Sequence, residues 1–132
     1  MTKKRPVIVI RLPEKLVMGQ ARLFLREIEA FLKADRPRLV FDFSAVSQVD
    51  AAGVEMLLNS MEEVMKRNGD LKLAAVPAGP ADILKLTRVD SLFEIFDNTS
   101  DAVESFHQVL PYSFPAALPW NEAPVPESES TL

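Results

Sequence analysis

The amino-acid sequence predicts an α/β fold, a mostly parallel or mixed central sheet of about four strands flanked by about four helices. Two observations carry this prediction. Short runs rich in β-branched and large apolar residues alternate with longer segments whose apolar residues recur every three or four positions. The loops that join these segments are short. Such an order is typical of parallel strands connected by helices that pack on the sheet.

The first half of the chain supplies two expected strands and one expected helix. Val7 to Ile10 is β-branched without alternation, which predicts a strand buried on both faces. Residues 19–33 carry apolar side chains at helical spacing, which predicts an amphipathic helix that stops at Arg36-Pro37. Residues 39–43 predict a second buried strand, and a loop of small and polar residues, 44–53, follows it.

The second half begins with an expected helix over about residues 52–67 that ends at Asn68-Gly69. Its buried stripe is predicted to hold Val54, Leu57, Leu58, Met61 and Met65. A third strand is expected over residues 71–76, a short helix over about 81–88 and a last strand over 92–96. Thr99 or Ser100 can cap a final helix that runs through about residue 109.

Chain length and composition predict one domain, over residues 1–110, and a separate tail. The 132 residues suffice for a single hydrophobic core. From residue 111 the composition changes, because five of the last 22 residues are proline, with serine and glutamate between them. Residues 111–132 are therefore expected to form an extended or disordered Pro-rich tail.

Composition also limits which cellular compartment and which classes of partner we expect. The chain has no cysteine, which fits a reducing compartment. Neither a secretory signal nor an apolar run of the ~20 residues that a membrane span needs is present. The net charge is −4, and the basic residues are scattered rather than gathered into a stripe. We expect a cytoplasmic protein that binds no nucleic acid and does not insert directly into a membrane.

The sequence contains no recognisable catalytic constellation. The single histidine, His107, falls near the end of the last expected helix, where a surface or capping role is typical. The four glycines match neither nucleotide-binding fingerprint, and no His, Asp and Glu cluster has metal-ligand spacing. Asp42 and Asp50 are expected to bond local backbone rather than to act as a carboxylate pair. The sequence predicts no enzyme, no catalytic residue, no cofactor and no metal.

The most informative stretch is residues 40–54, where a buried strand runs through a polar turn into Asp50-Ala51-Ala52-Gly53 at the start of a helix. Free backbone N–H groups and the positive end of the helix dipole lie at such a start. Asp50 can accept hydrogen bonds there as the N-cap. Small side chains leave the backbone open to a partner, so this stretch is the candidate docking site.

This stretch resembles the STAS domain family, typified by bacterial anti-anti-sigma factors. The matching residues are Phe41-Asp42-Phe43-Ser44, Val46, Val49-Asp50 and Gly53, followed by Gly69-x-Leu71-x-Leu73 and by Leu84, Leu86, Val89, Leu92, Phe93, Ile95 and Phe96. The resemblance covers roughly residues 7–109 and implies a single STAS-like domain. Family members usually have two strands before the first helix, so the first strand is expected to be missing here. The exposed sheet edge would then be covered by the tail or by a partner in a homodimer.

The resemblance implies a partner-switching regulator of transcription. Such a protein docks on an anti-sigma factor that is a serine kinase, and the kinase phosphorylates the hydroxyl residue directly before the motif glycine. That position is Ala52 here, so the usual phosphorylation is impossible and binding is expected to be constitutive. Ser47 and Ser60 are expected to be a turn serine and a helix-surface serine rather than substitutes. The expected partner-binding residues are Gln48, Asp50, Ala51, Ala52, Gly53 and Met56, the last as an exposed apolar contact or a partly buried core residue.

Two other interpretations stay open. Some STAS-like proteins resemble an accessory subunit of an ABC-type lipid-transport complex, whose partner would be an ABC ATPase subunit; the pair Ala51-Ala52 fits this as well. Alternatively, Asp50 to Gly53 is an ordinary strand-to-helix turn of an α/β domain. An enzyme or nucleotide-binding protein has no supporting residues.

Overall fold

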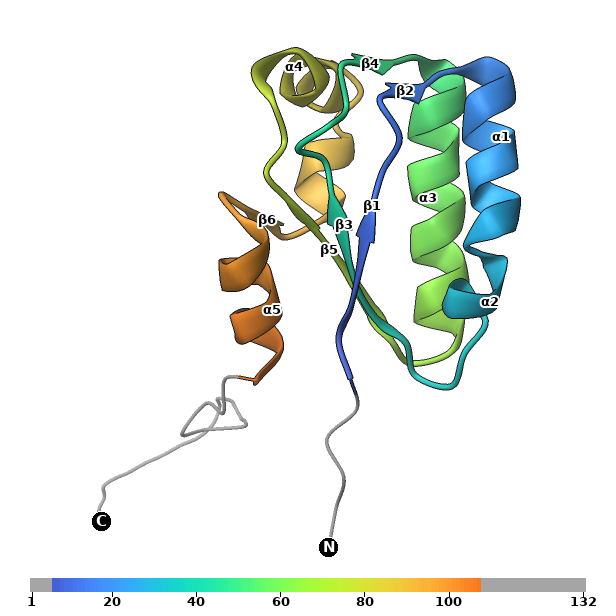
Figure 1. Cartoon of the computed structure of the whole chain (residues 1–132), viewed down its shortest axis with the longest axis vertical. Helices are drawn as coiled ribbons and strands as arrows, with labels where there is room; N and C mark the ends of the chain where they lie inside the picture. The colour runs from blue at the N-terminus through green and yellow to red at the C-terminus, as the bar shows by residue number, and fades with distance from the viewer. Residues whose placement is uncertain (1–5, 108–132) are drawn as a thin grey trace, which may run out of the picture.

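The computed structural model describes residues 6–107, which form a four-stranded sheet with helices on both faces (Figure 1). The sheet contains β1 (Ile8–Arg11), β3 (Arg38–Asp42), β5 (Asp70–Ala74) and β6 (Ile95–Phe96) in the order β1-β3-β5-β6, and all neighbours are parallel. Two short strands, β2 (Lys15–Leu16) and β4 (Gln48–Val49), pair separately, also in parallel. The predicted α/β fold with about four strands is confirmed.

The helices divide unequally between the two faces of the sheet. They are α1 (Met18–Glu27), α2 (Glu29–Leu32), α3 (Ala51–Lys66), α4 (Ala78–Leu86), the 3₁₀ turn η1 (Val89–Leu92) and α5 (Thr99–His107). Figure 1 shows α1 and α3 side by side on one face and α5 on the other. Leu84 of α4 and Val89 of η1 belong to the same buried cluster as Ala21 and Leu57, so α4 and η1 lie on the face of α1 and α3.

Strand alternation produces two cores of different size. Leu39, Phe41, Leu71 and Leu73 point toward α1, α3 and α4 and form the main core. The intervening Val40 and Ala74 point to the other face, where they pack with Ala102 of α5 and, at the margin, Val7, Phe96, Val103 and Phe106.

The C-terminus of α3 confirms the expected cap. Asn68 adopts a left-handed conformation with φ of 60°. Its N–H donates to the Met65 carbonyl at 3.1 Å, and the Gly69 N–H donates to the Val64 carbonyl at 3.0 Å. These two bonds form a Schellman motif, which satisfies the carbonyls that a helix end leaves free. Gly69 also abuts the backbone of Pro37, where a Cβ would collide.

Three expected elements are wrong in detail. The helix predicted over residues 19–33 breaks at Ile28 into α1 and α2, which keeps Ile28 and Leu32 both buried in the main core. The strand predicted over residues 92–96 is the end of η1 followed by the two-residue β6. β1 is not buried on both faces, since Val9 is 43% exposed at the edge of the sheet.

The buried stripe of α3 is also shifted from the prediction. Leu58 is 39% exposed and Met65 is exposed as well, although both were expected inside. The buried arc instead contains Val54, Leu57 and Val64 and extends toward α1 through Met56 and Ser60. Because α3 also packs against α1, its buried residues extend to that side of the helix. The spacing of apolar residues in α3 does not reveal this contact.

The boundary predicted between a domain of residues 1–110 and a tail of residues 111–132 lies outside the described residues. The same holds for the last two residues of the helix expected to end at about residue 109.

The buried face of α3 predicts that alanine substitution at two adjacent leucines lowers stability by different amounts. Leu57→Ala should lower the free energy of unfolding by about 2–5 kcal/mol, because it removes a fully buried side chain and leaves a cavity. Leu58→Ala should lower it by less than about 1 kcal/mol, because part of its side chain already contacts water. Urea unfolding of both variants measures the difference, and equal losses would contradict the stripe described here.

Candidate functional site

The connection from β3 to α3 is held by local backbone contacts of the kind expected for Asp42. The Asp42 carboxylate accepts a hydrogen bond from the Ser44 N–H at 2.9 Å, which closes a turn directly after β3. The Ser47 N–H donates to the Glu14 carbonyl at 2.8 Å, and the Ser47 hydroxyl donates to the same oxygen at 3.3 Å. This connection therefore lies against the segment that precedes α1.

Asp50 joins the first turns of two helices. One carboxylate oxygen, Oδ1, accepts from the Ala52 N–H at 2.9 Å and from the Gly53 N–H at 3.2 Å, which is the N-cap expected for α3. The other oxygen, Oδ2, accepts from the Met18 N–H at 3.1 Å, at the start of α1. One side chain thus satisfies three N–H groups that would otherwise lack partners and fixes α1 beside α3.

These contacts also set the protonation of Asp50. Desolvation of the carboxylate by its surroundings raises its pKa, but the hydrogen bonds from the backbone N–H groups of Met18, Gly53 and Ala52 outweigh this effect. The pKa of Asp50 is therefore lowered from its ordinary value, and the carboxylate is charged at neutral pH.

Gly53 allows α3 to approach β2 closely. A Cβ at this position would collide with the Leu16 carbonyl oxygen and lie 3.0 Å from Cγ1 of Val49. The Asp50 N–H donates to the same Leu16 carbonyl at 3.3 Å. The motif glycine therefore has a packing role, because any side chain would push the start of α3 away from the β2–β4 pair.

The candidate docking surface consists of the exposed side chains around this helix start. Gln48 and Ala51 are exposed, and Ala52 is half-buried. Ala52 lines a shallow groove of about 220 Å³ between α1 and α3. The other residues that line it are Ala21, Arg22, Leu25, Glu55, Met56 and Asn59.

Met56 and Ser60, which lie near this surface, are both buried. One of the two alternatives for Met56 and the prediction for Ser60 had placed these side chains in contact with solvent. Met56 is 2% exposed, so it is a core residue, and the alternative of an exposed partner contact is wrong. Ser60 was expected on the helix surface but is fully buried, and its hydroxyl donates to Sδ of Met56 at 3.5 Å. Both lie on the flank of α3 that faces α1, so the helical period of α3 alone left Met56 undecided and misplaced Ser60.

Met18 is an exposed apolar side chain of the kind that one of the two alternatives expected at Met56. It is 65% exposed, and its backbone lies at the Asp50 carboxylate, next to the first turn of α3. No pattern in the sequence indicates this neighbour, because the contact joins residues 32 positions apart.

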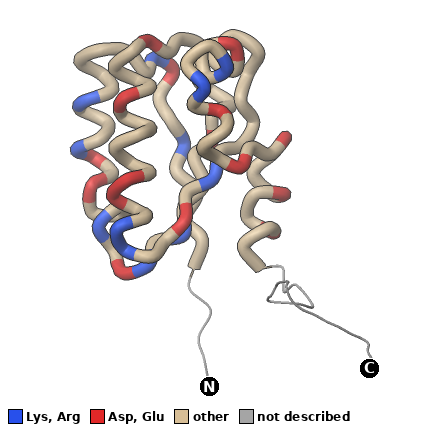
Figure 2. Tube along the Cα trace, turned by 180° about the vertical axis from the view of Figure 1, so that it is seen from behind, with Lys and Arg blue, Asp and Glu red and all other residues tan. Residues whose placement is uncertain are grey.

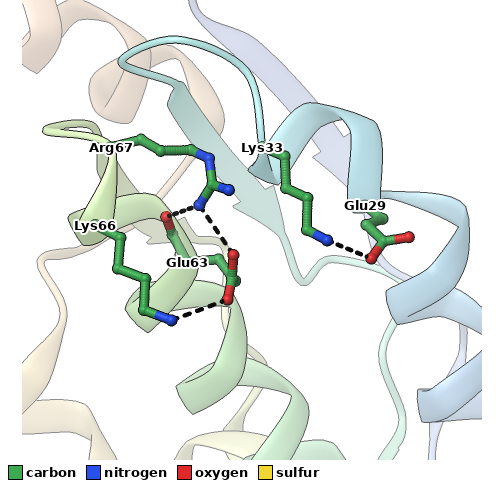
Figure 3. A network of polar contacts seen from close by, with 5 residues as sticks. All are labelled: Glu29, Lys33, Glu63, Lys66 and Arg67. Carbon is green, nitrogen blue, oxygen red and sulfur yellow. Dashed lines mark hydrogen bonds and ion pairs between the residues drawn. The ribbon is translucent and has the colours of Figure 1, made fainter.

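A separate group of charges lies at the other end of α1 and α3 (Figure 3). Lys33 pairs with Glu29 at 2.8 Å, and Glu63 pairs with Arg67 at 2.9 Å and with Lys66 at 3.5 Å. The carboxylate of Glu29 raises the pKa of Lys33. Each pair lies within one helical segment and is at least partly exposed, so it contributes little to stability. These residues form no site.

The described residues offer few features for other chemistry. Among residues 6–107, no group of three or more His, Cys, Asp and Glu side chains could hold a metal ion. His107 is exposed at the end of α5. Figure 2 shows acidic and basic residues interspersed over the helices, without a continuous basic stripe along the described trace. No helix in the same range is long and apolar enough to cross a membrane.

Comparisons with known proteins agree with this fold. The family model described as STAS domain matches residues 1–102. Among solved structures, a proposed anti-sigma factor antagonist from Thermotoga maritima has 22% identity and a TM-score of 0.69 over 76% of this chain and 88% of that one. An anti-sigma-factor antagonist (STAS) domain protein from Planctomyces limnophilus has 16% identity and a TM-score of 0.65, over 70% and 80% of the two chains. The STAS domain of a SulP transporter from Vibrio cholerae has 16% identity and a TM-score of 0.62, over 79% and 83%. At these identities the structures establish the fold alone.

The close approach of Gly53 to Leu16 predicts that alanine substitution at two glycines changes stability by very different amounts. Gly53→Ala should lower the free energy of unfolding by more than about 1 kcal/mol, because the new methyl group meets the Leu16 carbonyl. Gly79→Ala is the matched control in α4, where nothing lies within 4 Å of an added Cβ. It should leave stability unchanged or raise it by up to about 1 kcal/mol. Thermal unfolding followed by circular dichroism compares them, and a tolerated Gly53→Ala would refute the packing role.

The lowered pKa of Asp50 predicts a pH-dependent contribution to stability. Because the folded pKa lies below the unfolded value of about 3.9, the contribution is complete above that value and is lost as pH falls through the folded pKa. Asp50→Asn should therefore lower the melting temperature most at neutral pH, and the gap to the parent protein should shrink in acid. Melting curves between pH 7 and pH 2 measure this gap. Asp82→Asn makes the same chemical change at an exposed position on α4 and serves as the control substitution.

Proposed function

The chain belongs to the STAS domain family, and from this membership we propose that it is a non-catalytic protein-binding module that works as an anti-anti-sigma factor. STAS domains bind protein partners. The proposed partner here is an anti-sigma factor with serine-kinase activity. Docking uses the surface formed by Gln48, Ala51 and Ala52, flanked by Met18, and Asp50 and Gly53 hold that surface in place.

The observation that carries the proposal is the position of Ala52. It directly precedes the glycine that packs on Leu16, at the place where the resemblance puts the phosphoacceptor, and it lines the groove between α1 and α3. Asp50 fixes the backbone of this turn in one conformation. A partner would therefore meet a preformed backbone at Ala51 and Ala52 and would spend little free energy on ordering it.

The missing hydroxyl at position 52 makes the proposed complex constitutive. A phosphate would add a charge of about −1.5 to −2 within the contact and break it. No nearby serine takes over this role: Ser60 is fully buried, and the Ser47 hydroxyl already donates to the Glu14 carbonyl. The partner kinase then has no acceptor at this surface, and ATP has no effect on the complex.

A role as accessory subunit of an ABC-type lipid-transport complex is the second candidate. It is favoured by the pair Ala51-Ala52, since a subunit that braces an ATPase needs no phosphate cycle. The fold also occurs as a transporter domain in the SulP protein from Vibrio cholerae. In this case the partner is an ABC ATPase subunit, and the same preformed surface is available to it.

The proposed function predicts a partner that ATP does not release. Affinity capture of tagged protein from native lysate, with and without ATP, should recover a kinase-like anti-sigma factor in equal amounts, read by mass spectrometry. An ABC ATPase would favour the accessory-subunit role instead. Release by ATP, with phosphate on Ser47, would contradict the constitutive complex.

The docking surface is tested by adding charge. Ala52→Glu and Ala51→Glu should each weaken binding of the captured partner by at least roughly tenfold, about 1.4 kcal/mol, since a carboxylate must be desolvated in the contact. Ala30→Glu makes the same change at an exposed position of α2 and should leave binding unchanged. Equal affinities for all three variants, with unchanged melting temperatures, would place the partner on another surface.

A further inference from the structure

One flank of α3 carries a row of apolar side chains that the fold buries only in part. Ala51, Val54, Leu58, Met61 and Met65 follow one another at alternating intervals of three and four residues. This is the spacing at which one helix packs along another in a coiled coil. Val54 is buried and Met61 packs against the main core, but Leu58 is 39% exposed and Met65 is 56% exposed. Ala51, Leu58 and Met65, here called the outer row, contact solvent.

The described helices do not pack along the outer row. The main contacts of α3 are with α1, α2, β4 and β5. Both α1 and α2 lie on the opposite flank, where Met56, Asn59 and Glu63 line the grooves between the helices. Met65 is nine residues from Met56, which is two and a half helical turns, so the two side chains point in opposite directions. α4 contacts β4, and both lie at the end of the molecule where α3 begins (Figure 1).

The sheet extends this apolar surface beyond α3. The register pairs Ile95 of β6 with Leu73 of β5, so both side chains point to the face that α3 covers. Leu73 is fully buried, whereas Ile95 is 42% exposed. α3 connects β3 to β5, and α1 lies on its β1 side, so the flank with the outer row faces β6. The outer row and Ile95 therefore lie on the same side of the molecule.

The solvent border of the outer row is acidic. Glu55 and Glu62 are both exposed and lie one helical turn before and after Leu58. Neither forms an ion pair in the described part of the chain. Lys66, the one basic residue of α3, pairs with Glu63 at 3.5 Å on the flank toward α2. A partner that covers the outer row would therefore meet uncompensated negative charge beside it.

We propose that the outer row binds an amphipathic helix of a partner protein, whose apolar face carries lysine or arginine along the edge that meets Glu55 and Glu62. The coiled-coil spacing favours a helix as the occupant. The acidic border favours basic residues on that helix. The row is about 21 Å long, so roughly 14 residues of a partner helix would match it. Such a helix would bury Leu58 and Met65, the two side chains that the apolar spacing of α3 had predicted to lie inside.

This inference deepens the proposed function and rests on it for the identity of the partner, because Ala51 belongs to both surfaces. The partner would contact the first turn of α3 and then continue along the helix toward Met65. Its recognition would depend on apolar contact at the outer row and on charge at the border.

A synthetic peptide tests the surface independently of the natural partner. The probe is a fluorescein-labelled three-heptad helix with leucine at the a and d positions and lysine at e and g, and the matched peptide has glutamate at e and g. Fluorescence anisotropy with the full chain should show saturable binding of the lysine peptide. The glutamate peptide should bind at least roughly tenfold more weakly, a difference of about 1.4 kcal/mol.

Three variants of the full chain locate the contact. Met65→Asp should weaken binding of the lysine peptide by at least roughly tenfold, because it places a charge in the outer row. Leu23→Asp is the matched control at an exposed position of α1 and should leave binding unchanged. Glu62→Lys should reverse the preference between the two peptides.

Several outcomes would overturn the inference. It fails if the two peptides bind equally or not at all, or if Met65→Asp binds the lysine peptide as tightly as the parent protein does. A dimer of the parent protein that Met65→Asp dissociates in sedimentation would make a second copy the occupant. The chain has no native cysteine, so Met65→Cys carries a single thiol. Slow alkylation of this thiol at high dilution would assign the cover to another part of the same chain.

Failure of this inference is distinguishable from failure of the proposed function. If a captured anti-sigma factor is lost in Ala51→Glu but binds Met65→Asp with the parent affinity, the proposed function stands and the helix contact is wrong. If the lysine peptide binds as expected and no anti-sigma factor is captured, the helix-binding surface stands and the proposed function is wrong.

Discussion

The structure depends on the Asp50 carboxylate more than on any other polar group described. Its two oxygens bind the first turns of α1 and α3, so two of the helices that cover the main core share one anchor. Gly53 completes this arrangement, since the absence of a side chain lets the first turn of α3 lie against the Leu16 carbonyl. The β2–β4 pair provides that carbonyl in a fixed place. A change in Asp50, in Gly53 or in the β2–β4 pair is therefore expected to displace the other two.

The same contacts that build the fold also present the candidate docking surface. Ala51 and Ala52 follow Asp50 directly, so the hydrogen bonds that start α3 also fix their backbone. The groove beside them is lined by the small side chains of Ala21 and Ala52 and also by the charged Arg22 and Glu55. A partner would therefore meet a fixed backbone with both apolar and charged side chains around it.

The sequence was sufficient to predict the parallel strands, the order of the helices and the roles of Asp50 and Asn68, because these follow from local patterns and caps. It was insufficient where a residue depends on distant neighbours. Apolar spacing shows that α3 has a buried face but not that α1 covers its flank. Ser60 was therefore misplaced in one direction and Leu58 and Met65 in the other, and the choice between a core and an exposed Met56 stayed open. The strands β2 and β4 have two residues each, too few for any periodicity. Met18 joins the site only through a contact across 32 positions.

The two outer strands of the sheet have a consequence for the behaviour of the protein at high concentration. An outer strand exposes unpaired backbone groups that can recruit another chain into a growing fibril. Here β6 has two residues, and β1 has four, lies between Pro6 and Pro13 and carries the charged Arg11. Short length, flanking prolines and an edge charge are the features that limit such growth. The parallel sheet thus ends in two poor templates for aggregation, so the folded domain resists edge-to-edge association even at high concentration.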